Sequence, residues 1–226
     1  MKLYLYNQTR DRDLDEYIQK LNISSSEFDK LNTSKTNILL VGGGFSPIQP
    51  KFIQTLFHIT NIDFNPSEYQ TEKLHQISGD FLTQKIHNNF FDEVWALYSL
   101  PLYAQQTSSV DIFLAKSILA LKPGGFLRAF PIEFNSDDKL VTRDAEWEIS
   151  TPMVTGATMD FLFELQPFNV SIDFSLPNKN NERAVIVKIP KDIATKSALD
   201  NKMIGIIKAQ VKNMRKLSKI QIQKEP

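Results

Sequence analysis

The chain has 226 residues, of which 42% are hydrophobic and 23% are charged, with a formal net charge of zero and no cysteine. This composition predicts one globular domain with a substantial apolar core, and charge alone names no nucleic-acid or membrane partner. Disulfides, thiol catalysis and cysteine-based zinc sites are excluded, and the three scattered histidines suggest no metal site.

The first 16 residues lack the apolar core of a signal peptide, and no run approaches the roughly 18 apolar residues of a transmembrane helix. We therefore expect a cytoplasmic protein that does not enter a membrane. The charge is unevenly spread, because ten basic residues stand against three acidic ones between Lys188 and Glu225. The basic excess belongs to this C-terminal segment.

Residues 1–35 are predicted to form an N-terminal helical extension. Within residues 11–31, apolar side chains recur on one helical face: Leu14, Tyr17, Ile18 and Leu21. Ser24 and Glu27 have the spacing of a capping box, which would start a second helix. These helices fit either a layer packed on a sheet or a lid over a ligand cleft.

The next stretch combines a buried strand with a glycine turn. Residues 38–41 form a short apolar run typical of a buried parallel strand, and three glycines follow directly: Gly42, Gly43 and Gly44. Glycine tolerates a sharp turn and lets a ligand approach the backbone closely. Ser46 suits a helix N-cap and Pro47 the first helical position, so we expect a helix whose body is residues 51–57.

A second strand, residues 59–62, ends at Asp63, which lies 19 residues after Gly44. This matches the roughly 20-residue spacing at which an acid meets the ribose hydroxyls of a nucleotide. The pattern therefore predicts a nucleotide-binding turn. The alternative is a glycine turn that has no ligand.

An acid and an aromatic residue follow the third predicted strand. Pro66 can open a helix that runs to about Leu74, and a weak strand is expected at residues 76–78. Asp80 and Phe81 come next, placed to bind the amine and flank the ring of an adenine. An ordinary aspartate turn would explain the same residues.

The fourth predicted strand, residues 90–97, leads into a loop with two tyrosines and a serine: Tyr98, Ser99 and Tyr103. Ligands of open α/β sheets bind outside the carboxyl ends of the strands, so these side chains can shape a pocket or simply pack within the loop. A helix is expected at residues 111–121, a Lys-Pro-Gly-Gly turn at 122–125 and a fifth strand at 126–131.

Residues 150–165 suit a helix, and residues 168–174 and 183–189 alternate like two strands of a hairpin. Residues 196–219 are helical in pattern, with a basic stripe beside an apolar one. The basic stripe consists of Lys208, Lys212, Arg215 and Lys219. It fits a solvated surface helix, an anionic partner such as nucleic acid, or a contact in a homodimer.

The segments VGGGFS, NIDFNP, SGDFL, FDEVWALYSLP and LKPGGFLRAF follow one another as in the class I S-adenosylmethionine-dependent methyltransferases, and the chain resembles that family over roughly residues 36–131. The resemblance implies an α/β fold with a doubly wound, seven-stranded, mostly parallel sheet of order 3-2-1-4-5-7-6 and helices on both faces. It implies a Rossmann-like domain at 36–190. The helical pattern of the C-terminal segment predicts a basic amphipathic helix at 191–226 that packs on the same domain.

The resemblance also implies how S-adenosylmethionine is bound. Gly42, Gly43 and Gly44 would pass under the methionine portion of the cofactor. Asp63 would bind the ribose, with Phe64 beside the adenine. Asp80 would meet the adenine amine and Phe81 the face of its ring.

Tyr98 and Ser99 would border the methyl group. Tyr103, Glu133 and Trp147 are candidates for the acceptor side of the site. No general base is evident, because no histidine falls near the carboxyl ends of the strands. Methyl transfer from a sulfonium is a direct displacement, for which the protein mainly supplies alignment and exclusion of water.

Two positions depart from the family pattern. Leu40 stands where the family usually carries an acid that helps to hold the amino-acid end of the cofactor, and Ser46 stands at its third glycine. A non-catalytic relative that only binds the cofactor is therefore an alternative. If the acid alone is missing, Leu40→Glu should tighten cofactor binding.

Other nucleotide enzymes fit the residues less well. A nicotinamide enzyme needs a third glycine or alanine where Pro47 stands, and proline has no N–H to offer a pyrophosphate. Aminopropyl transferases, which are alkyl transferases of the same fold, need acids after the loop and after the fourth strand. We expect a methyltransferase that acts on a small molecule, because the sequence shows no separate nucleic-acid-binding domain.

Overall fold

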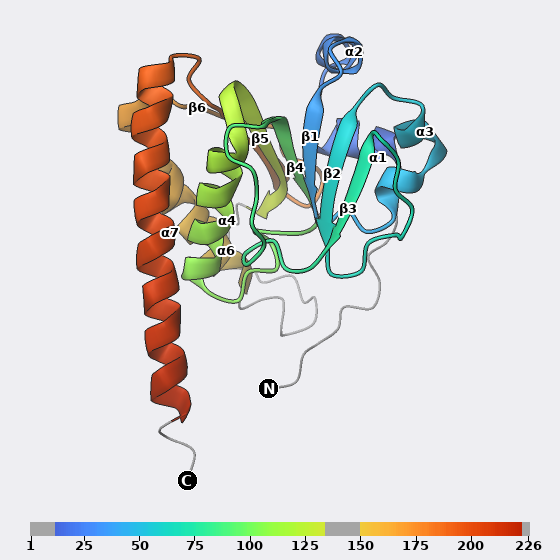
Figure 1. Cartoon of the computed structure of the whole chain (residues 1–226). Coiled ribbons are helices and arrows are strands. Elements are labelled where there is room, and N and C mark those ends of the chain that lie inside the picture. Colours follow the sequence, from blue (N-terminus) through green and yellow to red (C-terminus); the bar gives the residue numbers. More distant parts are fainter. Residues whose placement is uncertain (1–11, 134–149, 223–226) are drawn as a thin grey trace.

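The computed structural model describes residues 12–133 and 150–222 (Figure 1). Its seven strands form one sheet in the order β3-β2-β1-β4-β5-β7-β6, as predicted. The first five strands pair in parallel, and β7 runs antiparallel to both of its neighbours. The strands are β1 (Asn37–Val41), β2 (His58–Asp63), β3 (Leu74–Ser78), β4 (Phe91–Leu97), β5 (Leu121–Glu133), β6 (Ser171–Phe174) and β7 (Glu182–Lys188).

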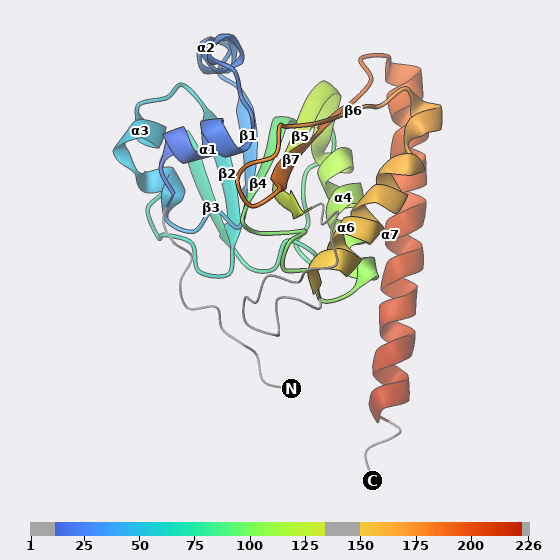
Figure 2. The same ribbon diagram turned by 180° about the vertical axis from the view of Figure 1, so that it is seen from behind.

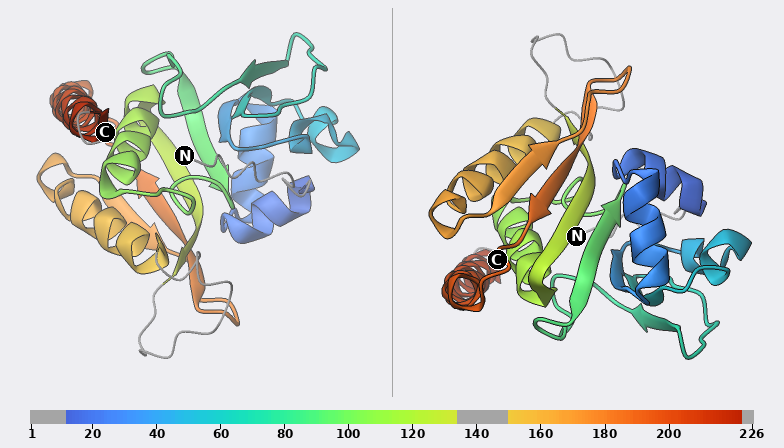
Figure 3. Two further views of the ribbon diagram at one scale, coloured as in Figure 1. Left: turned by 90° about the horizontal axis from the view of Figure 1, so that it is seen from below. Right: turned by 90° about the horizontal axis from the view of Figure 1, so that it is seen from above.

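Helices cover both faces of the sheet, as Figure 3 shows from below and from above. One layer holds α1, α2 and α3, and the other holds α4, α6 and α7. Their bounds are α1 (Leu14–Lys20), α2 (Ser25–Thr33), α3 (Pro50–Ile53), α4 (Thr107–Ala120), α6 (Ser150–Phe163) and α7 (Ile193–Ile222).

Strand β1 explains why two helical layers are needed. Its apolar residues alternate between two separate cores, because successive side chains of a strand point to opposite faces. Ile38 and Leu40 pack towards α1, whereas Leu39 and Val41 pack towards α4. The unbroken apolar run therefore reports a strand that is buried on both faces.

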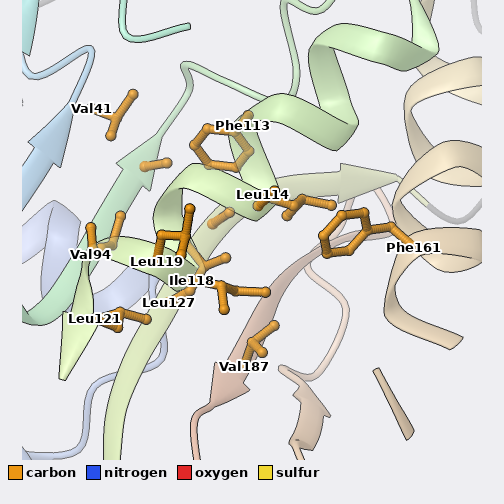
Figure 4. Packing of buried hydrophobic residues seen from close by; sticks show 14 of the residues in the cluster. Val41, Val94, Phe113, Leu114, Ile118, Leu119, Leu121, Leu127, Phe161 and Val187 are labelled. Carbon is orange, nitrogen blue, oxygen red and sulfur yellow. The ribbon is translucent and has the colours of Figure 1, made fainter. Parts of the chain in front are cut away.

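The larger core lies between the sheet and α4, α6 and α7. In Figure 4 the side chains of α4, among them Phe113 and Ile118, point towards residues of β4 and β5 such as Val94 and Leu127. Each fully buried side chain of this kind contributes about 1.5–3 kcal/mol to stability. The helix predicted at 111–121 is present as α4, and Ile112, Ala115 and Ile118 are buried on it.

A buried ion network attaches the N-terminal layer to the sheet. The Arg128 side chain of β5 lies 3.1 Å from a carboxylate oxygen of Glu93 and 3.0 Å from one of Glu27, and it also donates to the carbonyl oxygens of Leu21 and Asn22. Burial raises the pKa of Glu93 to about 7, against the lowering effect of the guanidinium. The predicted capping box of α2 is present, and its Glu27 is also a partner of Arg128, so the network ties α2 to β5.

Helix α7 packs along α4, and its C-terminal part extends past the other elements in Figures 1 and 2. Gln210 donates a hydrogen bond of 2.7 Å to Asp111 of α4. Lys208 and Lys212 are exposed, while the side chains of the predicted stripe residues Arg215 and Lys219 lie outside the described part of the structure. Within the described ranges, no helix is long and apolar enough to cross a membrane.

Two predicted helices are wrong. The helix at 51–57 is reduced to the four residues of α3, because the Thr55 hydroxyl donates a hydrogen bond to the backbone carbonyl of Phe52. The helix at 66–74 does not form. The hydroxyls of Ser67 and Thr71 instead accept hydrogen bonds from backbone N–H groups two residues ahead, which favours turns over helix.

Two smaller predictions also need correction. Residues 122–125 belong to an irregular start of β5, where Gly124 has a φ of 82° and its N–H donates to the carbonyl of Pro190. The strand predicted at 168–174 is only β6, since Asn169 is left-handed and ends a 3-10 turn at Gln166–Phe168. Neither difference changes the order of the strands.

Candidate functional site

The glycine turn lies at the point where the strand order reverses. Strand β1 pairs with β2 on one side and with β4 on the other, so their carboxyl ends meet at this edge of the sheet. Gly42 and Gly44 have φ angles of 70° and 52°, in the region that favours glycine. A Cβ on Gly42 would lie 2.4 Å from the Cβ of Ser99, whose hydroxyl donates to the carbonyl of Val41 at 2.6 Å.

The protein itself binds the N–H groups of the glycine turn. The N–H of Gly43 donates to the Asn61 carbonyl oxygen at 3.2 Å, and the N–H of Gly44 donates to the Asp63 carboxylate at 3.0 Å. The Asn61 amide nitrogen also donates to the carbonyl of Gly44 and to the side chain of Gln76. These N–H groups are therefore not available to a pyrophosphate, in contrast to a dinucleotide-binding turn.

Asp63 ends β2 with a carboxylate that is held in place. Its second oxygen accepts the N–H of Asn65 at 2.8 Å, and the residue is 6% exposed. A carboxylate has about four acceptor positions, so each oxygen retains one for a ligand hydroxyl. Phe64 follows with 75% of its surface exposed, and Gly79 donates to the backbone carbonyl of Asp63, which joins the ends of β2 and β3.

The loop after β3 presents Asp80 but not Phe81. One Asp80 oxygen accepts the N–H of Leu82, and among the described residues the other has no hydrogen-bond partner. Phe81 was expected against the face of an adenine. The structure instead buries its ring to 3% exposure, 5.7 Å from the ring of Phe113 in the core, because an apolar ring in this loop gains more from burial beneath α4.

Lys116 of α4 forms hydrogen bonds to the backbone of the same loop. Its ammonium donates to the backbone carbonyls of Phe81 and Gln84 at 2.5 and 2.6 Å. Burial lowers the pKa of Lys116 to about 8, with the charge of Asp80 acting in the opposite direction. The position of Asp80 thus depends on a lysine that lies 36 residues further along the chain.

The end of β4 carries Tyr98 in a left-handed conformation, with a φ of 48°. Its ring packs edge-on against Phe130 and lies 4.9 Å beneath the guanidinium of Arg12. The backbone N–H of Arg12 donates a hydrogen bond to the hydroxyl of Ser46, which stands at the position of the family's third glycine. Ser46 is therefore not a helix N-cap; it attaches the N-terminal layer to the glycine turn.

Two of the three predicted acceptor-side residues belong to the described part of the structure, where they lie on different elements. Tyr103 is 40% exposed on the loop after β4. Glu133 is the last residue of β5, paired with Glu182 of β7, and Trp147 lies outside the described residues. Two surface cavities of about 320 and 450 Å³ lie elsewhere, beside α3 and at the amino end of β1, and neither is lined by the glycine turn.

Leu40 is a core residue. It is fully buried in the cluster that holds Tyr17 and Trp95, and its Cβ lies beneath the glycine turn. Burial raises the pKa of Tyr17, its neighbour in this cluster, to about 12. The departure from the family pattern is thus an apolar packing residue on the α1 face of the sheet.

Four residues with clear contacts in the site were missed from the sequence: Arg12, Asn61, Gln76 and Lys116. One signal was present, because Asn61 interrupts the apolar run of β2 and is nevertheless fully buried. A buried amide needs hydrogen-bond partners, and Asn61 finds them in the backbone of the glycine turn and in the side chain of Gln76. Nothing in the local sequence marks the other three.

No protein-family model matches the sequence, and no characterised protein matches it by sequence. Solved structures are similar in fold. A Burkholderia thailandensis 1,6-didemethyltoxoflavin-N1-methyltransferase, solved with its substrate and S-adenosylhomocysteine, is 14% identical with a TM-score of 0.53, over 79% of this chain and 85% of that one. A Methanosarcina mazei S-adenosylmethionine-dependent methyltransferase is 16% identical with a TM-score of 0.51, over 73% and 97%.

The [4+2]-cyclase SpnF is as similar, at 14% identity and a TM-score of 0.52 over 79% of this chain and 80% of that one. A Bordetella parapertussis protein is longer, so that this chain covers 65% of it. At these identities the likeness concerns the fold. Together with the strand order, it shows that the chain has the fold of the class I S-adenosylmethionine-dependent methyltransferases.

Proposed function

We propose that the protein is an S-adenosylmethionine-dependent methyltransferase acting on a small molecule. The observation that carries the proposal is the glycine turn, whose N–H groups are bound by Asn61 and Asp63. Such a turn suits a nucleoside cofactor that has no phosphates. The two similar methyltransferases support the same cofactor.

In this proposal the ribose hydroxyls donate to Asp63, and the adenine lies beside the exposed ring of Phe64 with its amine near the free oxygen of Asp80. The methionine portion passes over Gly42–Gly44, and Tyr98 and Ser99 border the methyl group. Phe81 packs against Phe113 in the core and so supports the loop that carries Asp80.

The cofactor supplies a methyl group on a sulfonium, which is reactive by itself. The residues of the chain then have three tasks: to hold the nucleoside, to orient the methyl group and to exclude water. Tyr103, Glu133 and Trp147 remain our candidates for contacting the acceptor. The small-molecule preference is supported by the Burkholderia enzyme, which was solved with a small-molecule substrate.

A second candidate is a protein that keeps the cofactor pocket but transfers no methyl group. The similarity to a [4+2]-cyclase favours it, because that structure shares the fold at the same level of similarity. The apolar Leu40 at the position of the family's acid is also compatible with it. Cofactor binding without turnover, in a broad screen with S-adenosylmethionine labelled on its methyl group, would favour this candidate.

Calorimetry with S-adenosylmethionine and S-adenosylhomocysteine tests the cofactor. Asp63→Ala should weaken binding by roughly tenfold to a hundredfold, because hydrogen bonds to a charged group contribute about 1.5–3 kcal/mol. Asp173→Ala is the control, since Asp173 is exposed on β6 at the far edge of the sheet. If the parent protein binds neither ligand at millimolar concentration, the proposal is wrong.

A further inference from the structure

Arg12 lies between the two elements that would enclose the amino-acid end of the cofactor. Its backbone N–H donates to the Ser46 hydroxyl at 3.0 Å, two residues beyond the glycine turn. Its guanidinium lies 4.9 Å from the centre of the Tyr98 ring, at the end of β4. Ser99, the next residue, lies against Gly42, so Arg12 contacts residues that follow the glycine turn and residues that adjoin it at the end of β4.

The charge of Arg12 has no protein counterion within the described residues. Arg12 is 8% exposed, and no carboxylate of residues 12–133 or 150–222 forms an ion pair with it. Arg128 shows the ordinary arrangement of a buried arginine, because it is 2% exposed and pairs with both Glu27 and Glu93. A buried cation without a counterion is costly, so a site that retains one is suited to an anion brought by the ligand.

We propose that the Arg12 guanidinium binds the carboxylate at the amino-acid end of the cofactor. The ring of Tyr98 packs against one side of the planar guanidinium, whose N–H edge has no hydrogen-bond partner in residues 12–133 and 150–222 and can make bidentate contact with a carboxylate. Because Leu40 is apolar, it cannot pair with the ammonium group of the cofactor, so we expect the carboxylate of the cofactor to be the charged group that the protein recognises at that end. The inference rests on the proposed function and adds to it the group that recognises the amino acid.

Binding measurements with two nucleosides distinguish carboxylate recognition by Arg12 from a purely structural role of this residue. S-Adenosylhomocysteine carries the carboxylate, whereas 5′-methylthioadenosine has the same nucleoside and thioether without the amino acid. Arg12→Met should weaken S-adenosylhomocysteine about tenfold to a hundredfold and leave 5′-methylthioadenosine within twofold of the parent value. Arg12→Lys should fall in between, because lysine keeps the charge but loses the bidentate geometry.

Lys20→Met is the matched control. Lys20 also belongs to the N-terminal layer and places its ammonium 5.0 Å from an aromatic ring, that of Phe130. This variant should bind both ligands like the parent protein, as measured by calorimetry, with melting temperatures recorded for all variants.

Unchanged binding of S-adenosylhomocysteine by Arg12→Met would overturn the inference. Equal losses for both ligands would overturn it as well, because they would mean that Arg12 only supports the fold. These results differ from a failure of the proposed function, in which the parent protein itself binds neither nucleoside.

Discussion

The side-chain carbonyl oxygen of Asn61 accepts the backbone N–H of Gly43, although the two residues belong to different strand ends. The Asn61 amide nitrogen bonds the carbonyl of Gly44, so one buried side chain satisfies both a donor and an acceptor of the turn. A Cβ on Gly43 would lie 2.4 Å from the side-chain carbonyl oxygen of Asn61. The close approach explains why the turn needs glycine at this position as well as at Gly42.

Replacing Asn61 should therefore disturb the turn more than the strand. Asn61→Leu leaves the N–H of Gly43 buried without a partner, and we expect a loss of about 2–4 kcal/mol of stability together with weaker cofactor binding. Thr158→Val is the control, because the Thr158 hydroxyl on α6 is buried without a hydrogen-bond partner among the described residues. It should cost about 1 kcal/mol or less in urea unfolding; equal losses for the two variants would contradict this role of Asn61.

Gly42→Ala should be poorly tolerated. The φ of 70° is unfavourable for alanine, and the new Cβ would meet the Cβ of Ser99, so we expect a loss of about 2–4 kcal/mol. Gly156→Ala makes the same chemical change in α6, where nothing lies within 4 Å of the added Cβ. It should stabilise the protein by about 0.5–1 kcal/mol, and differential scanning calorimetry of both variants checks the contrast.

Leu40→Glu should destabilise the protein and not tighten cofactor binding. The sequence alone suggests that the change restores a missing family residue, but Leu40 is fully buried beside Trp95 and Tyr17. An unpaired carboxylate there should cost on the order of 3–5 kcal/mol. Leu40→Met keeps the volume and should cost less than about 1.5 kcal/mol. A Leu40→Glu variant that melts like the parent protein and binds S-adenosylhomocysteine more tightly would show that the acid reaches the pocket.

Lys116 should make stability depend on pH at the alkaline side. Burial lowers its pKa from 10.5 to about 8, so the folded protein loses this proton before the unfolded chain does. The contribution of Lys116 to stability therefore rises with pH between about 8 and 10.5 and is smallest below pH 8. Urea unfolding at pH 7 to 10 should show the parent gaining stability relative to Lys116→Met; two parallel curves would refute the assignment.

The sequence by itself determined the frame of this protein. The strand order agrees with the order that the resemblance implies. The apolar run at residues 38–41 also predicts a strand that is covered on both faces, and the structure has a core on each face. Spacing also singled out the glycines and Asp63, and the structure places the N–H of Gly44 on the Asp63 carboxylate, while their role towards a cofactor stays a prediction. Local patterns suffice here because a strand, a turn and the next strand are neighbours along the chain.

Tertiary structure decided which side chains hold the turn. Arg12 reaches Ser46 across 34 residues, and Lys116 reaches Phe81 across 35, contacts that no local pattern contains. The physical reason is the same in each case: a hydrogen-bonding or charged group takes the partner that the packed sheet brings within about 3 Å, and the order of residues does not state which one that is.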